Sequence, residues 1–140
     1  MTNAYMRHAS AMYQQTRAAG SVEGADPHQL IAMLLDGAME RVAQARGGVR
    51  QHDAGVKGTA IGKAIAIVGE LRTSLNLEAG GQLAQRLDSL YDYVNRRLLH
   101  AQLNDDDRAL VECLDLLGQV RDGWNGIRGN YLAERAGKTA

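Results

Sequence analysis

Proline is almost missing from this chain: Pro27 is the single proline among 140 residues. Proline breaks helices more strongly than any other residue, because it lacks a backbone N–H and clashes with the preceding turn. Beyond Pro27, nothing forces a helix to end except glycine, of which the chain has 16, and local capping. Alanine and leucine are abundant and β-branched residues are few. This composition favours helix over sheet.

Apolar residues recur every three or four positions in four long stretches, which is the spacing of one helix face. The first helix is expected to begin at Asp26, a good N-cap, with Pro27 in its first turn. The four predicted helices cover about residues 26–52, 54–76, 82–103 and 108–131. Each predicted helix has a stripe of residues along one face. In the order of the helices, the stripes are Leu30, Met33, Leu34, Gly37, Ala38, Arg41 and Ala45 in the first; Ile61, Ala64, Ile65, Val68, Leu71, Arg72 and Leu75 in the second; Leu83, Leu87, Leu90, Tyr91, Val94, Leu98 and Ala101 in the third; and Leu110, Cys113, Leu114, Leu117, Val120, Trp124, Ile127 and Tyr131 in the fourth.

Four long helices joined by short turns must run alternately up and down. No stretch of the sequence alternates between apolar and polar residues as a strand would. The predicted fold class is therefore all-α: an antiparallel up-down-up-down four-helix bundle with a short N-terminal helical arm. We expect residues 1–24 to form the arm or cap, residues 25–132 the bundle, and residues 133–140 a disordered tail.

The charge balance and the cysteine count narrow the classes of partner. Lys+Arg and Asp+Glu are 16 each, whereas proteins that bind nucleic acids are usually basic. Cys113 is the single cysteine, so an intramolecular disulfide and a Cys-based zinc site are excluded. No stretch resembles a signal peptide or approaches the ~20 apolar residues that span a bilayer. We expect a cytosolic protein with no nucleic-acid partner and no membrane insertion.

The residues that could carry catalysis form no recognisable pattern. The four histidines, His8, His28, His52 and His100, lack a carboxylate three residues before them, so the Glu-x-x-His motif of di-iron bundles is absent. Cys113 falls on an apolar stripe, a position that favours packing over nucleophilic catalysis. The sequence contains no glycine-rich phosphate-binding loop with the Gly-Lys-Ser/Thr ending. The sequence therefore indicates no enzyme activity, no catalytic or metal-ligating residue and no cofactor.

Glycines recur at a strict seven-residue interval, Gly55, Gly62 and Gly69, inside the predicted helix 54–76. Each costs ~0.5–1 kcal/mol relative to alanine in a helix interior. This spacing places the glycines along one side of the helix, where another helix can approach closely. Two explanations remain open: tight packing within the bundle, or a shallow groove for a helix that a partner supplies.

Three ordered segments resemble one known family. Residues 25–38, Ala-Asp-Pro-His-Gln-Leu-Ile-Ala-Met-Leu-Leu-Asp-Gly-Ala, resemble its opening helix. Residues 63–76, with Lys-Ala-x-x-Ile-Val-x-Glu-Leu-x-x-Ser-Leu-Asn, resemble its third helix. Residues 80–98, with Gly-Gly-x-Leu-Ala-x-x-Leu-x-x-Leu-Tyr-Asp-Tyr-Val-x-Arg-Arg-Leu, resemble its fourth helix.

Asn104-Asp105 and Trp124 match the family's last turn and last helix, so the resemblance runs over about residues 3–131 in one register. On these motifs the chain is identified as a member of the flagellin-specific export chaperone family, FliS. It departs from the family pattern at Leu35, where a tyrosine is usual, and at Gln102, where an asparagine is usual.

The resemblance implies a non-enzymatic cytosolic chaperone that holds the C-terminal region of newly made flagellin and prevents premature polymerisation. It also implies delivery of flagellin to a membrane protein of the flagellar type III export gate, and an anti-sigma factor as a further partner. The residues expected to bind the partner are Tyr5, Met6, Tyr13, Leu30, Met33, Leu34, Gly37, Gly62, Gly69, Tyr91 and Tyr93.

Two questions stay open at this point. The arm, with Tyr5 and Tyr13, is expected to be either a displaceable cap or part of the binding surface. The residues alone are also compatible with a self-associating structural or scaffold bundle, which would form a stable oligomer without any partner.

Overall fold

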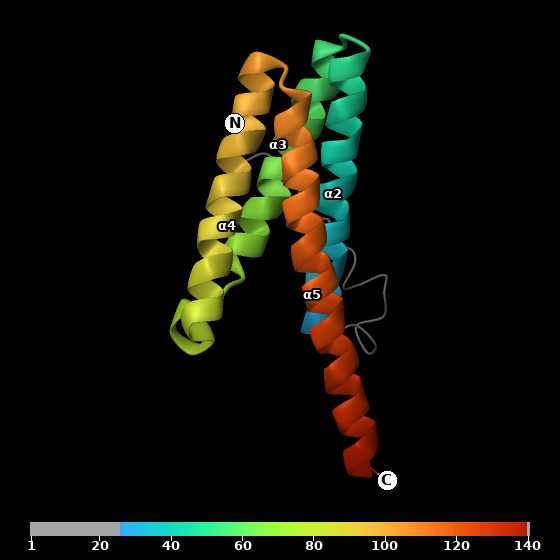
Figure 1. Cartoon of the computed structure of the whole chain (residues 1–140), viewed down its shortest axis with the longest axis vertical. Coiled ribbons are helices and arrows are strands. Elements are labelled where there is room, and N and C mark those ends of the chain that lie inside the picture. The colour runs from blue at the N-terminus through green and yellow to red at the C-terminus, as the bar shows by residue number, and fades with distance from the viewer. Residues whose placement is uncertain (1–25, 140) are drawn as a thin grey trace.

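Four α-helices form an elongated bundle in the computed structural model, which describes residues 26–139 (Figure 1). The helices are α2 (Pro27–Arg50), α3 (Ala54–Thr73), α4 (Leu77–Asn104) and α5 (Asp107–Thr139). Each packs against the next along the chain and α5 packs back on α2, so neighbouring helices are antiparallel. The predicted up-down-up-down bundle is confirmed, and the described residues contain no strand. The arm predicted over residues 1–24 lies outside the described residues.

Aspartate caps begin the first two helices. The carboxylate of Asp26 accepts a hydrogen bond from the backbone N–H of Gln29 at 2.8 Å, with Pro27 in the first turn, as the sequence predicts. Asp53 caps α3 in the same way and accepts from the backbone N–H of Val56 at 3.0 Å. Each cap satisfies one of the backbone donors that a helix start leaves without an intrahelical partner.

The later helix boundaries differ from the predicted ones in two places. α3 ends at Thr73, slightly before residue 76. α4 has a first turn that ends at Gly81 (φ 56°, ψ −136°), so its main part begins close to residue 82, as predicted. α5 continues to Thr139, past the predicted end near Tyr131 and through most of the predicted tail. The strong helix formers of residues 132–139 and the absence of proline favour this extension. The division into arm, bundle and tail stays a prediction.

The buried face of α2 matches the predicted stripe only in part. Leu30, Ala38 and Ala45 of that stripe are buried, but Leu35 and Val42, outside it, are fully buried, and Met33 on the stripe is 45% exposed. Apolar residues in α2 fit several overlapping three- and four-residue spacings, so periodicity alone could not select the face. In the other helices the predicted stripes do supply core residues: Ile61, Ala64, Val68 and Leu71; Tyr91, Val94, Leu98 and Ala101; and Leu110, Cys113 and Leu117.

Three consecutive aspartates at the turn between α4 and α5 join all four helices at the upper end of the bundle in Figure 1. The pairs are Asp105 with Lys57 of α3, Asp106 with His100 of α4 (3.1 Å), and Asp107 with Arg46 of α2 (2.9 and 3.1 Å). Asp106 also caps α5 by accepting from the backbone N–H of Ala109. The turn therefore attaches to every helix through a charged side chain.

Close contact between the α2 and α3 backbones accompanies this attachment. A Cβ atom at Gly48 would lie 2.6 Å from the backbone nitrogen of Lys57 and 2.9 Å from its Cα, so only glycine fits there. The side chain of Lys57 is buried, and its ammonium donates to the carbonyl of Gln102 at 3.1 Å as well as to Asp105. Burying a charge is costly without such partners. Gly48 and Lys57 thus fix the separation of α2 and α3.

At the lower end the helices separate into two pairs (Figure 1). Arg72 of α3 donates to Asp88 and Asp92 of α4, at 2.6 and 3.1 Å. The indole N–H of Trp124 in α5 donates to the carbonyl of His28 in α2 at 2.7 Å, and the two rings stack at 4.8 Å. Polar contacts therefore hold α3 to α4 and α2 to α5 at this end.

We predict that Leu117→Ala lowers the free energy of unfolding by about 2–5 kcal/mol, because it removes a buried side chain and leaves a cavity. Leu117 is fully buried in the core cluster. Leu103→Ala is the matched control, since Leu103 is 77% exposed. Urea unfolding followed by circular dichroism measures both. Equal effects of the two substitutions would contradict the assigned core.

Acid should weaken the upper end of the bundle. Hydrogen bonds from the Ala109 N–H and His100 lower the pKa of Asp106 from 3.8, and the Arg46 guanidinium lowers that of Asp107. A carboxyl whose pKa is lower in the folded state stabilises the protein above its unfolded pKa, and this contribution is lost as the pH falls through the folded value. We predict that stability declines below about pH 5.

Urea unfolding at a series of pH values measures this decline. Asp107→Asn should reduce both the stability at neutral pH and the steepness of the acid decline, since it removes one of the titrating carboxylates. Asp115→Asn, at an exposed carboxylate on the same helix, is the control and should leave the curve unchanged. An identical acid decline in the Asp107 variant would contradict the role of this pair.

Candidate partner-binding surfaces

The lower halves of α4 and α5 carry facing apolar side chains. Tyr93 and Arg97 of α4 contact Glu112 of α5, which defines the sides on which these two helices meet. Helical spacing of three and four residues continues those sides downward. The apolar residues found there are Leu83, Leu87 and Leu90 on α4, and Leu116, Val120 and Ile127 on α5. We call this set the fork.

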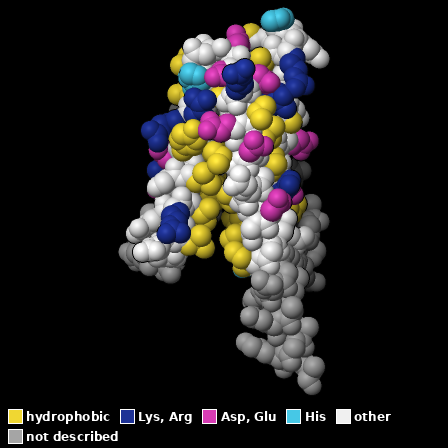
Figure 2. Space-filling view, viewed as in Figure 1, with side chains coloured by type: hydrophobic (Ala, Val, Ile, Leu, Met, Phe, Trp, Pro, Cys, Tyr) yellow, Lys and Arg dark blue, Asp and Glu magenta, His cyan; other side chains and the backbone are white. Residues whose placement is uncertain are grey.

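The fork is partly open. Leu83 is 58% exposed and Ile127 is 45% exposed, whereas Leu87, Leu116 and Val120 are half-buried against the core and Leu90 is half-buried. Within the described residues, no hydrogen bond or ion pair joins residues 82–92 to residues 114–127. Figure 2 shows hydrophobic side chains running down the front of the molecule into the hollow between the two helices. The fork is therefore an exposed apolar surface.

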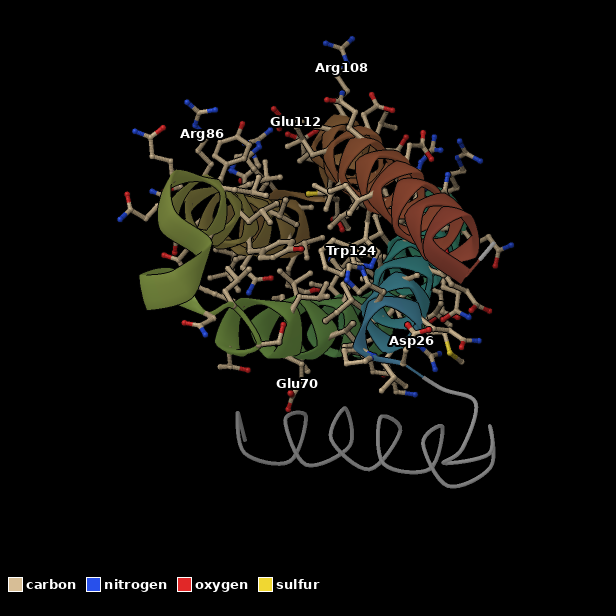
Figure 3. All side chains as sticks on the ribbon, turned by 90° about the horizontal axis from the view of Figure 1, so that it is seen from below. Asp26, Glu70, Arg86, Arg108, Glu112 and Trp124 are labelled. Atoms are coloured by element: carbon tan, nitrogen blue, oxygen red, sulfur yellow. The ribbon has the colours of Figure 1, made fainter. Side chains whose placement is uncertain are left out.

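The edges of the fork differ in polarity. Arg86 of α4 is exposed, and Figure 3 shows it on the same side of the bundle as Glu112. Trp124 lies toward the bundle axis beside α2 in the same view from below. A segment entering the fork would meet leucine side chains on its walls, an aromatic ring deeper inside and a cation at one edge.

The glycines of α3 lie along its contact with α4. The side chain of Gln102 is 3.5 Å from the position of a Cβ on Gly58, and Asn95 donates to the carbonyl of Ile65 at 3.5 Å. Gly62 and Gly69 fall on this same side of α3 by helical spacing. We call the line of Gly58, Gly62 and Gly69 the seam. Leu99, which is 53% exposed, lies between Asn95 and Gln102 on the facing side of α4.

Space beside the seam is not uniform. Gly58 is close to Gln102, but no atom lies within 4 Å of a Cβ placed on Gly69. Packing within the bundle therefore does not require glycine at Gly69. Among the glycines at the seven-residue interval, an added Cβ would lie 3.5 Å from the Asp53 side chain at Gly55 and in open space at Gly69, so neither has a side chain of α4 against it. The two explanations that the sequence left open stay predictions.

The expected partner-binding residues of α2 do not share one environment. Leu30 is buried, and Leu34 is half-buried against the core. Met33 is exposed, whereas Gly37 faces Ile67 of α3, whose Cδ1 atom would lie 3.8 Å from an added Cβ. Met33 alone among these four offers a large exposed side chain.

The tyrosines that the sequence singled out are also divided. Tyr91 is 2% exposed, and burial raises the pKa of its hydroxyl to about 12. The hydroxyl of Tyr93 lies at the surface and donates to Glu112 at 2.7 Å, which raises the pKa of Tyr93 and lowers that of Glu112. Tyr93 therefore stands at the top of the fork, whereas Tyr91 packs inside. Tyr5, Met6 and Tyr13 lie outside the described residues.

The predicted stripes contain every fork residue except Leu116, but they do not indicate that Leu83 and Ile127 are exposed. Leu83 and Ile127 sit on regular apolar stripes, and nothing in the spacing distinguishes them from buried neighbours. Their position near the ends of long helices was the one available signal, because helices anchored at one end can separate at the other.

The described residues offer no reactive centre. No group of three or more His, Cys, Asp or Glu side chains among them could hold a metal ion. Burial raises the pKa of the Cys113 thiol to about 12, and its Sγ lies 3.7 Å from the carbonyl of Val94. A thiol in this state is a poor nucleophile. In residues 26–139, no helix is long and apolar enough to cross a membrane.

Comparison with known proteins agrees with the family that the sequence motifs resemble. The family described as "Flagellar protein FliS" matches residues 9–131. A flagellar secretion chaperone FliSB of Pseudomonas aeruginosa is 45% identical over 123 residues, which cover 88% of this chain and 98% of the relative. The flagellar secretion chaperone FliS of Salmonella typhimurium is 42% identical over 116 residues, covering 82% and 86%. That of Bacillus subtilis is 31% identical over 112 residues, covering 80% of each.

The family match spans almost the whole bundle, and the ordered motifs of the first three helices fall inside it. The partly exposed apolar fork is typical of a surface that binds another protein. On this evidence from motifs, bundle and relatives, the chain belongs to the FliS family of flagellar proteins.

Proposed function

We propose that this protein is a cytosolic flagellar export chaperone without enzyme activity, and that it binds the C-terminal helical region of flagellin in the fork. Bound there, flagellin could not polymerise prematurely and would be delivered to a membrane protein of the type III export gate. The supporting relatives are named flagellar secretion chaperones. The anti-sigma factor that the sequence resemblance implies remains a second proposed partner.

The exposed apolar surface of the fork is the observation that carries this proposal. Leu83 and Ile127 remain largely in contact with solvent although they continue the core stripes of α4 and α5. An amphipathic helix binds such a groove through apolar side chains at three- and four-residue spacing. A segment that is disordered when free must bury a large apolar area to offset its ordering entropy. The fork supplies apolar walls on two helices for this purpose.

The position of α2 bears on the arm. α2 begins at Pro27 at the lower end of the bundle, where the fork opens, and the arm precedes α2 in the sequence. Tyr5, Met6 and Tyr13 give the arm an apolar face. We propose that the arm occupies the fork when flagellin is absent, with an effective concentration of ~mM set by its short tether. Flagellin would displace it.

We predict that Leu83→Asp abolishes co-purification of this protein with a flagellin C-terminal fragment, because it places a charge on an apolar wall of the fork. Leu103→Asp is the matched control: it is the same substitution on the same helix, at the opposite end of the bundle, where Leu103 is 77% exposed. Circular dichroism establishes that both variants fold, and isothermal titration calorimetry measures the affinity.

Retained binding by Leu83→Asp would exclude the fork as the flagellin site. An equal loss of flagellin affinity in both variants would show that a charge at any exposed leucine weakens binding, and that the effect is not specific to the fork. A stable oligomer of the unmodified protein on size-exclusion chromatography, together with no flagellin binding, would favour the scaffold alternative.

The seam gives a separate prediction. Gly69→Leu should leave the melting temperature within a few degrees of that of the wild type, since a side chain there enters open space. It should weaken flagellin binding if the bound segment extends from the fork across Gly69. Gly47→Leu is the control, because no atom lies within 4 Å of a Cβ placed on Gly47 either, and Gly47 lies in α2 near the upper end of the bundle, away from the fork. Unchanged affinity in the Gly69 variant would restrict flagellin to the fork.

A further inference from the structure

On the side of the bundle opposite to the fork, α2 and α3 enclose a cleft of about 440 Å³. Figure 3 shows these two helices across the bundle from the opening between α4 and α5. The residues that line the cleft are Arg41 and Gln44 of α2, and Gly55, Val56, Thr59, Ala60 and Lys63 of α3. Its floor is apolar, with Val56 45% exposed. Its edges carry two cations.

Those two cations lack carboxylate partners, unlike most cations of the bundle. Arg46, Arg72, Arg97 and Arg121 all pair with aspartate or glutamate. Among the described residues, Arg41 bonds only to the side-chain oxygen of Gln44, at 3.1 Å, and no ion pair includes Lys63. The residues that line the cleft include these two cations and no carboxylate. The cleft is therefore lined by positive charge on a chain whose formal net charge is zero.

We propose that this cleft binds an acidic segment of a second protein partner, one that seats an apolar side chain on Val56 and Ala60 and places carboxylates near Arg41 and Lys63. Carboxylate bonds to arginine and lysine are stronger than neutral ones, and complementary charge selects the partner. Since the cleft and the fork lie on opposite faces, cargo and this partner can bind at the same time.

The chain itself has no suitable occupant. The predicted arm, residues 1–24, contains Arg7 and Arg17 against a single acid, Glu23. Residues 128–140 carry three cations and one acid. The acidic run 105–107 of a second copy is already bonded to Lys57, His100 and Arg46 of its own bundle. An acidic segment must therefore come from another protein.

A defined peptide tests this proposal. The probe is a fluorescein-labelled, alanine-based helical peptide with one leucine flanked by glutamates four residues to each side. Fluorescence anisotropy measures its binding to the full chain. We expect saturable binding that weakens with salt, and no binding of otherwise identical peptides carrying glutamine or lysine in place of glutamate. Equal binding of the glutamine peptide, or no binding of the acidic peptide, would overturn the proposal.

Charge reversal locates the site. Arg41→Glu/Lys63→Glu should reduce the affinity for the acidic peptide at least about tenfold, or 1.4 kcal/mol. The matched control is Arg96→Glu/Arg108→Glu, which makes the same change in net charge at two exposed arginines outside the cleft. An equal loss in the control would show general charge attraction and overturn the proposal.

Two further measurements separate the other possible occupants. A saturating flagellin C-terminal fragment should leave the anisotropy titration unchanged; displacement of the peptide would make the cleft part of the cargo site instead. The elution volume on size-exclusion chromatography should be the same for wild type and for Arg41→Glu/Lys63→Glu. A shift to a smaller species in the variant would identify the cleft as a contact between copies and overturn the proposal.

Discussion

The bonds made by Asp105, Asp106 and Asp107 hold all four helices together at one end of the bundle. Each carboxylate engages a lysine, histidine or arginine on a different helix, and the buried ammonium of Lys57 lies where the backbones of α2 and α3 touch at Gly48. No comparable set of contacts joins α4 to α5 at the other end of the described structure. The helices are therefore free to part there, and the fork follows from this asymmetry.

The asymmetry accounts for the proposed chaperone role without any catalytic group. An all-helical bundle that buried every apolar stripe would present no surface to an amphipathic cargo. Here Leu83 and Ile127 stay exposed on stripes that are buried higher up. The cleft edged by Arg41 and Lys63 lies on the far face and has a different character, apolar at its floor and positive at its edges. Two surfaces of unlike chemistry suit two unlike partners.

Much of the candidate site could not be predicted from the sequence, and the reason is physical. Periodicity shows which residues share a helix face, but not whether a second helix covers that face. Tyr91 and Tyr93 are two residues apart, yet one is buried and the other is bonded to Glu112 at the surface. Gly58 and Gly69 lie on one side of α3, yet only Gly58 has a side chain of α4 against it.

The sequence by itself determined the helical class, the number and approximate extent of the helices, the Asp26 cap and the family. The helical class, the extent of the helices and the cap depend on local properties, namely proline content, apolar spacing and capping, whereas the family follows from the ordered motifs that the chain shares with it. Only the tertiary structure decided which side of α2 faces the core, that Gly48 is required by backbone contact, and that α4 and α5 separate below Glu112. These depend on distances between helices, which are set by ion pairs between residues far apart in the chain.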